Sequence, residues 1–119
     1  MATKRVLIVE DERPLSHALQ LKLTHEGFDV KVANDGKEGM DLLMSQDFDV
    51  VLLDMMMPVM DGFQVLKQLQ DRPNRPVVFV LSNLSQREDE SRVLEAGAAK
   101  YFIKADTPLS VIVEEVTKA

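Results

Sequence analysis

Short apolar runs, rich in β-branched residues, recur along the chain and set its pattern. Four of them predict buried strands of a parallel sheet, at residues 6–9, 50–53, 77–81 and 101–103. A fifth run, 28–33, alternates apolar with charged side chains. Because neighbouring residues of a strand point to opposite faces, this alternation predicts a half-buried edge strand.

The segments between these runs repeat apolar residues at helical spacing, and each carries a start or stop signal. Proline near a helix start, glycine after its end, and an Asp or Ser followed by Glu or Gln three positions on are such signals. The expected boundary residues are Pro14 and Gly27 for a first helix, Asp35 and Glu38 for a second, Asp61 and Gln64 for a third, Ser85, Glu88 and Gly97 for a fourth, and Pro108 in the first turn of a fifth.

Five strands that alternate with five helices predict an α/β protein with a doubly wound parallel sheet. Right-handed crossovers then distribute the helices over both faces. No linker, repeat or low-complexity tract interrupts residues 1–119. We therefore expect a single domain.

The composition narrows the possible functions. Twenty acidic and fourteen basic side chains give a net charge of −6, which disfavours direct binding to nucleic acid. The absence of cysteine excludes disulfides and thiolate chemistry and fits a reducing compartment. No apolar run approaches the roughly 20 residues that span a bilayer. We expect a cytoplasmic domain without membrane insertion.

Polar residues follow four of the predicted strands at the point where each strand ends. They are Glu10, Asp11 and Glu12 after the first, Asp54 after the third, Ser82 and Asn83 after the fourth, and Lys104 after the fifth. Since parallel strands end at the same edge of a sheet, where open α/β proteins bind ligands, these groups are expected to converge.

Such a cluster has a definite chemistry. Asp11 and Asp54, together with Glu10, offer hard oxygen ligands of the kind that Mg²⁺ prefers. Lys104 and Ser82 are suited to bind phosphoryl oxygens, by charge and by hydrogen bonding respectively. A carboxylate in this position can itself act as a nucleophile and form an acyl phosphate.

Several motifs occur in order along the chain: Val-Leu-Ile-Val-Glu-Asp-Glu at 6–12, Ala-Asn-Asp-Gly at 33–36, Asp-Met-Met-Met-Pro at 54–58 with Met-Asp-Gly at 60–62, the run 76–82, Glu-Ala-Gly-Ala at 95–98 and Tyr-Phe-Ile-Lys at 101–104. With these motifs the sequence resembles the receiver domain of bacterial two-component response regulators over essentially its whole length. The resemblance implies a flavodoxin-like strand order, 2-1-3-4-5.

The resemblance also implies a role for each matching residue. Asp54 would accept a phosphoryl group from a sensor histidine kinase or phosphotransfer protein, so the chain would be a phosphoacceptor signalling domain rather than an enzyme with a separate substrate. A downstream effector protein would bind the face of the fourth helix, fifth strand and fifth helix. The remaining roles are Asp11 as a direct Mg²⁺ ligand, Glu10 as a ligand directly or through water, Met56 as a ligand through its backbone carbonyl, Ser82 as the switch hydroxyl, Lys104 as the phosphoryl partner and Tyr101 as the aromatic that changes exposure.

Three positions depart from the family pattern. Glu10 stands where Asp is usual, Asn83 where a small residue is commoner, and Ala105 where a proline typically follows a cis peptide. A cis bond before a residue other than proline costs about 3–4 kcal/mol. We therefore predict a trans peptide between Lys104 and Ala105.

Three other functions share parts of this pattern. A flavodoxin-like electron carrier needs a phosphate-cradling loop after the first strand, but the loop here is triply acidic and would repel a flavin phosphate. A Mg²⁺-dependent phosphohydrolase needs a substrate-covering cap, for which 119 residues leave no room. A degenerate receiver, which binds partners without phosphorylation, stays open, as does whether the receiver stands alone or is cut from a longer protein.

The fourth helix has an unusual composition. No apolar residue occurs from Ser85 to Arg92, and only Val93, Leu94 and Ala96 can anchor its C-terminal end. Because most helical stability in proteins comes from packing of an apolar face, we expect this helix to be loosely held. We hypothesise that its position responds to phosphorylation of Asp54.

Overall fold

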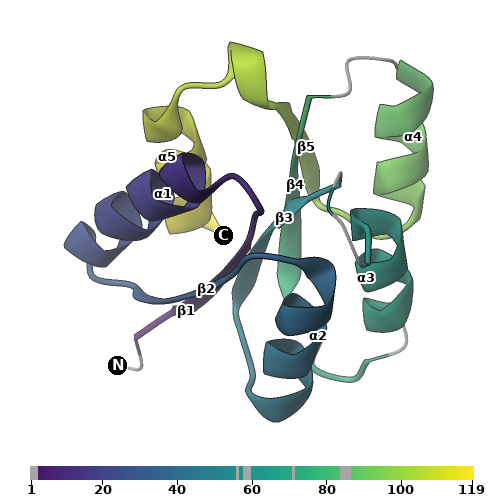
Figure 1. The fold of residues 1–119 in the computed structure, drawn as a ribbon, viewed down its shortest axis with the longest axis horizontal. Coiled ribbons are helices and arrows are strands. Elements are labelled where there is room, and N and C mark those ends of the chain that lie inside the picture. The colour runs from purple at the N-terminus through teal and green to yellow at the C-terminus, as the bar shows by residue number, and fades with distance from the viewer. Residues whose placement is uncertain (1–2, 56, 58–59, 71, 84–86) are drawn as a thin grey trace.

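The computed structural model describes residues 3–55, 57, 60–70, 72–83 and 87–119 (Figure 1). Its strands are β1 (Arg5–Val9), β2 (Asp29–Ala33), β3 (Val50–Asp54), β4 (Val77–Ser82) and β5 (Lys100–Ile103). Its helices are α1 (Arg13–His25), α2 (Gly36–Ser45), α3 (Gly62–Leu69), α4 (Arg87–Glu95) and α5 (Leu109–Lys118), with a short 3₁₀ turn, η1 (Lys104–Asp106).

The five strands form one parallel sheet in the order β2-β1-β3-β4-β5, so the predicted fold and strand order are confirmed. β2 lies at one edge, and Asp29 and Lys31 on it are exposed while Val30 and Val32 are half-buried. The predicted edge strand is therefore also confirmed. Figure 1 shows α1 and α5 on one face of the sheet and α2, α3 and α4 on the other.

Each face of the sheet has its own apolar core, because alternate strand residues point to opposite sides. Leu7, Val51 and Val80 belong to the core under α2, α3 and α4. Val6 and Leu52 belong to the core under α1 and α5. The central strands are thus apolar on both faces, which explains their continuous β-branched runs.

Most of the expected helix ends are observed where the structure describes them. Gly27 and Gly97 follow α1 and α4 with φ of +97° and +114°, a conformation that glycine adopts without strain. Asp61 and Gln64 form a reciprocal capping box at the start of α3. The Asp35 carboxylate accepts a hydrogen bond from the backbone N–H of Glu38 at the start of α2.

Two boundary predictions need comment. Pro108 is the N-cap of α5 rather than part of its first turn, because the helix begins at Leu109. The difference of one residue leaves the inward-facing side chains of α5 unchanged. Ser85 and the side chain of Glu88, predicted to cap α4, lie outside the described residues.

Candidate functional site

Three carboxylates meet at the carboxyl edge of the sheet. Glu10 and Asp11 follow β1, and Asp54 ends β3; one oxygen of each lies within 4.8 Å of the others. Glu10 and Asp54 are buried, with exposed fractions of 1% and 3%. The predicted convergence of residues from two distant parts of the chain is confirmed.

Lys104 lies beside this acidic group. Its Nζ is 2.6 Å from Glu10 Oε1 and 3.3 Å from Asp54 Oδ2. A third carboxylate, Glu12 Oε2, lies 3.4 Å away. Because β5 ends directly before it, the Lys104 ammonium reaches the space between the ends of β1 and β3, as the sequence predicted.

The surroundings of Lys104 act on its pKa in two directions. Burial, the largest influence, disfavours the ammonium form, but the hydrogen bond from Lys104 to Glu10 and the charges of Asp54 and Glu10 outweigh it and raise the pKa of Lys104. A raised folded-state pKa contributes stability that is fully present below the unfolded-state value and is lost as the pH rises through the folded value. The contribution of the Lys104 ammonium therefore stabilises the fold at neutral pH and is lost as the pH rises through the raised pKa of Lys104.

The donor set fits a divalent cation such as Mg²⁺. Glu10 Oε2 accepts a hydrogen bond from the backbone N–H of Glu12, at 3.0 Å. Glu10 Oε1 is buried, and its close polar partner among the described residues is the Lys104 ammonium at 2.6 Å. A buried carboxylate beside two further carboxylates is a suitable ligand for a hard cation.

Asp54 and Ser82 are fixed by the sheet more firmly than expected. The sequence placed both just beyond their strands, whereas the structure makes them the last paired residues, with Asp54 opposite Leu81 and Ser82 opposite Ile103. Ser82 is fully buried one strand away from Asp54. Strand pairing therefore sets the backbone position of both side chains.

The other predicted residues occupy varied positions. Tyr101 is half-buried on β5 and packs against the core under α2, α3 and α4. Asn83 is exposed directly after Ser82. Met56, predicted to offer its carbonyl to the metal, and Pro58 lie outside the described residues.

The peptide between Lys104 and Ala105 is trans, as predicted. Residues 104–106 form the turn η1, and the Thr107 hydroxyl donates a hydrogen bond to the Ile103 carbonyl at 2.8 Å. The chain therefore leaves β5 through a compact turn without a proline. Lys104 still reaches Glu10 and Asp54.

One contributor to the site, Asn34, was not singled out from the sequence. Asn34 donates a hydrogen bond from Nδ2 to the Glu10 carbonyl at 3.2 Å, and the Glu10 N–H donates to the Ala33 carbonyl at 3.0 Å. Together they fix the loop that carries the acidic residues. The sequence offers Asn34 only as part of the motif Ala-Asn-Asp-Gly at 33–36.

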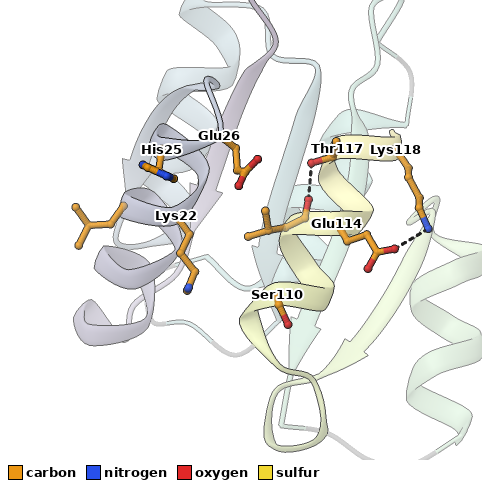
Figure 2. A pocket seen from close by; sticks show the side chains of 9 residues that line it. Lys22, His25, Glu26, Ser110, Glu114, Thr117 and Lys118 are labelled. Carbon is orange, nitrogen blue, oxygen red and sulfur yellow. Dashed lines mark hydrogen bonds and ion pairs between the residues drawn. The ribbon is translucent and has the colours of Figure 1, made fainter.

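A separate cavity of about 630 Å³ lies between α1 and α5 (Figure 2). It contains none of the clustered carboxylates. Its walls mix charges of both signs, and Lys118 pairs with Glu114 on its own helix at 3.1 Å. The group of Glu10, Asp11 and Asp54 therefore lies at the sheet edge and not in this cavity.

Within the described ranges, no helix is both long and apolar enough to pass through a membrane.

Gly62 holds the loop that follows Asp54 close to the start of α3. Its N–H donates to the Met55 carbonyl at 3.2 Å, and a Cβ added there would lie 2.7 Å from Met55 Cα and 2.9 Å from the Asp54 carbonyl oxygen. Both atoms belong to the backbone, so they cannot move aside without displacing the site. The position therefore requires glycine for close approach.

We predict that Gly62→Ala lowers the free energy of unfolding by about 1–3 kcal/mol, because overpacking displaces the backbone. In an unhindered helix, Gly→Ala raises the free energy of unfolding by roughly 0.5–1 kcal/mol. The sign of the change therefore shows whether Gly62 is needed for close approach. Urea unfolding followed by circular dichroism measures it. Gln68→Ala, at an exposed position of the same helix, is the control; a Gly62→Ala midpoint at or above that of the control contradicts the prediction.

Comparison with known proteins gives a consistent result. A family model described as "Response regulator receiver domain" matches residues 6–115. Curated relatives include "Response regulator ArlR" of Staphylococcus epidermidis, 35% identical over 99 residues, and its namesake in Staphylococcus aureus, 33% identical over 100 residues. The matches cover 83% and 84% of this chain but 45% of each relative, so the chain spans about half the length of these proteins.

Solved structures agree with this fold. The receiver domain of the Francisella response regulator 1452 is 29% identical, with a TM-score of 0.91 over 98% of this chain and 95% of that one. The receiver domain of a signal transduction histidine kinase from Syntrophus aciditrophicus is 28% identical, with a TM-score of 0.87 over 98% of this chain and 89% of that one.

Proposed function

Since this chain belongs to the response regulator receiver domain family of two-component signalling, we propose that it is a phosphorylation-controlled switch with Asp54 as its phosphoacceptor. One observation carries the proposal: the buried Asp54 carboxylate lies within reach of the Lys104 ammonium and of two further carboxylates. This arrangement combines a nucleophile, a counter-charge and a set of hard metal ligands.

The proposed reaction is the transfer of a phosphoryl group from a phosphohistidine to Asp54. An Asp54 carboxylate oxygen attacks phosphorus and forms an O–P bond, while the N–P bond breaks and the donor imidazole keeps the electron pair and takes up a proton. Lys104 balances charge that spreads over the equatorial oxygens, so catalysis is mainly positioning and electrostatics. A Mg²⁺ ion held by Asp11, Asp54 and Glu10, with the Met56 carbonyl as a further ligand, would supply additional neutralisation of the phosphoryl oxygens.

The acyl phosphate carries roughly −1.5 to −2 charges beside Lys104 and Ser82, in place of the single charge of the Asp54 carboxylate. We propose that contacts from the Ser82 hydroxyl and the Lys104 ammonium to the phosphoryl oxygens favour a second conformation, in which Tyr101 changes its exposure. The phosphoryl group can shift the equilibrium between the two conformations only by as much as its contacts stabilise one conformation more than the other. Hydrolysis of the acyl phosphate resets the equilibrium.

Receiver domains of this family interact with histidine kinases and with effectors. For this chain we propose a sensor histidine kinase or phosphotransfer protein as donor, in the cytoplasm, and an effector that binds the α4–β5–α5 face rather than nucleic acid. Leu94 on α4 and Val111 on α5 are 40% and 38% exposed, so an apolar side chain on each of these helices is accessible to a partner.

The attachment of α4 supports its proposed mobility. Its C-terminal end is held by side chains of the segment between α3 and β4: Gln70 Nε2 donates to the Ala96 carbonyl at 3.0 Å, and an Arg75 guanidinium nitrogen donates to the Gly97 carbonyl at 2.6 Å. Residues 90–92, nearer the start of the helix, are exposed. We predict faster amide hydrogen exchange at 90–92 than in the middle of α1, where Leu19 is buried; equal protection contradicts this.

The test of the function is intact-mass measurement after incubation with acetyl phosphate. With Mg²⁺ present, we expect the wild-type protein to gain the mass of one phosphoryl group, and chelation of the metal should prevent the gain. A wild-type protein that gains no mass under these conditions contradicts the proposal and favours the degenerate receiver.

A further inference from the structure

Glu12 occupies the N-cap position of α1 but does not cap the helix. Its side chain makes no capping hydrogen bond. Short polar residues such as Ser, Thr, Asp and Asn are the ones that normally cap. The Glu12 carboxylate instead lies 3.4 Å from Lys104 Nζ, 92 positions later in the chain. The contact with Lys104, rather than helix capping, accounts for the placement of this side chain.

Glu12 differs from the other two carboxylates that share the Lys104 ammonium. Glu10 and Asp54 belong to the group of metal-ligand candidates, and their side chains are 1% and 4% exposed. The Glu12 side chain is 53% exposed. It can therefore turn into solvent at little cost in desolvation, whereas Glu10 and Asp54 are held in place by burial.

We propose that Glu12 is a positioning residue that holds Lys104 in the unphosphorylated protein and competes with the phosphoryl group for it. This inference rests on the proposed phosphorylation of Asp54. A phosphoryl group on Asp54 brings strong acceptor oxygens and negative charge next to Lys104. Glu12 must then release the ammonium, because like charges at one site repel each other.

The competition has a consequence for small anionic phosphodonors. When acetyl phosphate reacts, an Asp54 oxygen bonds to phosphorus, the bond from phosphorus to the acetate oxygen breaks, and acetate leaves with the electron pair. The donor approaches as an anion and must take over Lys104 from Glu12. The charge of Glu12 therefore slows this reaction, and its removal is expected to accelerate it.

The test compares the initial rate of phosphorylation by acetyl phosphate with Mg²⁺ in wild type and Glu12→Gln, measured by intact mass. We expect Glu12→Gln to react about three- to five-fold faster at low ionic strength. This factor corresponds to the upper end of the interaction free energies of exposed ion pairs. The advantage should shrink in about 1 M salt, where charges are screened beyond roughly 3 Å. A merely structural effect of the substitution would not depend on salt in this way.

Glu26→Gln is the matched control, since it makes the same change in net charge at an exposed position beyond the other end of α1. It should react at the wild-type rate. A Glu12→Gln rate equal to wild type, or a gain that does not depend on salt, overturns the inference alone, because the wild type still reacts. A wild type that gains no phosphoryl group overturns the proposed function, and the inference with it.

Discussion

Asp54→Asn is expected to gain no phosphoryl mass when it is incubated with acetyl phosphate and Mg²⁺, while the wild type gains one group. The substitution keeps the size of the side chain but replaces the anionic nucleophile with a neutral amide. Asp54 is 3% exposed and paired through its backbone at the end of β3, so no neighbouring carboxylate occupies the same position. The loss should therefore be complete rather than partial.

Asp41→Asn serves as the control for the change in net charge. Asp41 is exposed on α2, outside the acidic cluster. This variant should be phosphorylated like the wild type. If Asp54→Asn gained the same mass as the control, another residue would be the acceptor and the assignment of Asp54 would be wrong.

Lys104→Met is expected to lower the free energy of unfolding by about 3–5 kcal/mol in metal-free buffer, because breaking a buried ion pair by removing one partner leaves uncompensated charge. Lys104 lies 2.6 Å from Glu10 and 3.3 Å from Asp54, both of which are buried. Without the ammonium, the clustered carboxylates repel one another. Urea unfolding in the presence of a chelator measures the loss.

Mg²⁺ should restore part of the stability that Lys104→Met loses, because a bound cation replaces the missing positive charge and stabilises the native state that binds it. Lys100→Met is the matched control: Lys100 pairs with Glu115 at 2.5 Å, but its side chain is 50% exposed. Exposed pairs contribute little, so the control should unfold close to the wild-type midpoint. Equal destabilisation of the two variants would show that burial of the Lys104 pairs is not the cause.

The sheet and its strand order could be predicted because the pattern of apolar residues in each strand indicates how many of its faces are buried. The runs at 6–9 and 50–53 are apolar at every position, as strands buried on both faces must be, and the run at 28–33 alternates as an edge strand does. The site followed from topology alone, since parallel strands bring Asp11, Asp54 and Lys104 to one edge.

Side-chain detail could not be predicted in the same way. Nothing in the sequence spacing indicates that Lys104 contacts Glu12 as well as Glu10, because the contact depends on rotamers and on the path of the turn after β5. The observed ends of β3 and β4 also lie one residue beyond the ends predicted from the sequence. Asp54 and Ser82 are polar and mark the end of an apolar run, yet both still pair with the neighbouring strand.

The three parts of the site are carried by β1, β3 and β5, which are not successive along the chain and span most of the sheet. A slip of one residue in the pairing of β3 with β4 would turn Asp54 toward the opposite face. Misregistered chains would therefore not bring Asp54 together with Glu10 and Asp11. If this group binds a divalent metal as proposed, metal binding would report that the strands have paired in the native register.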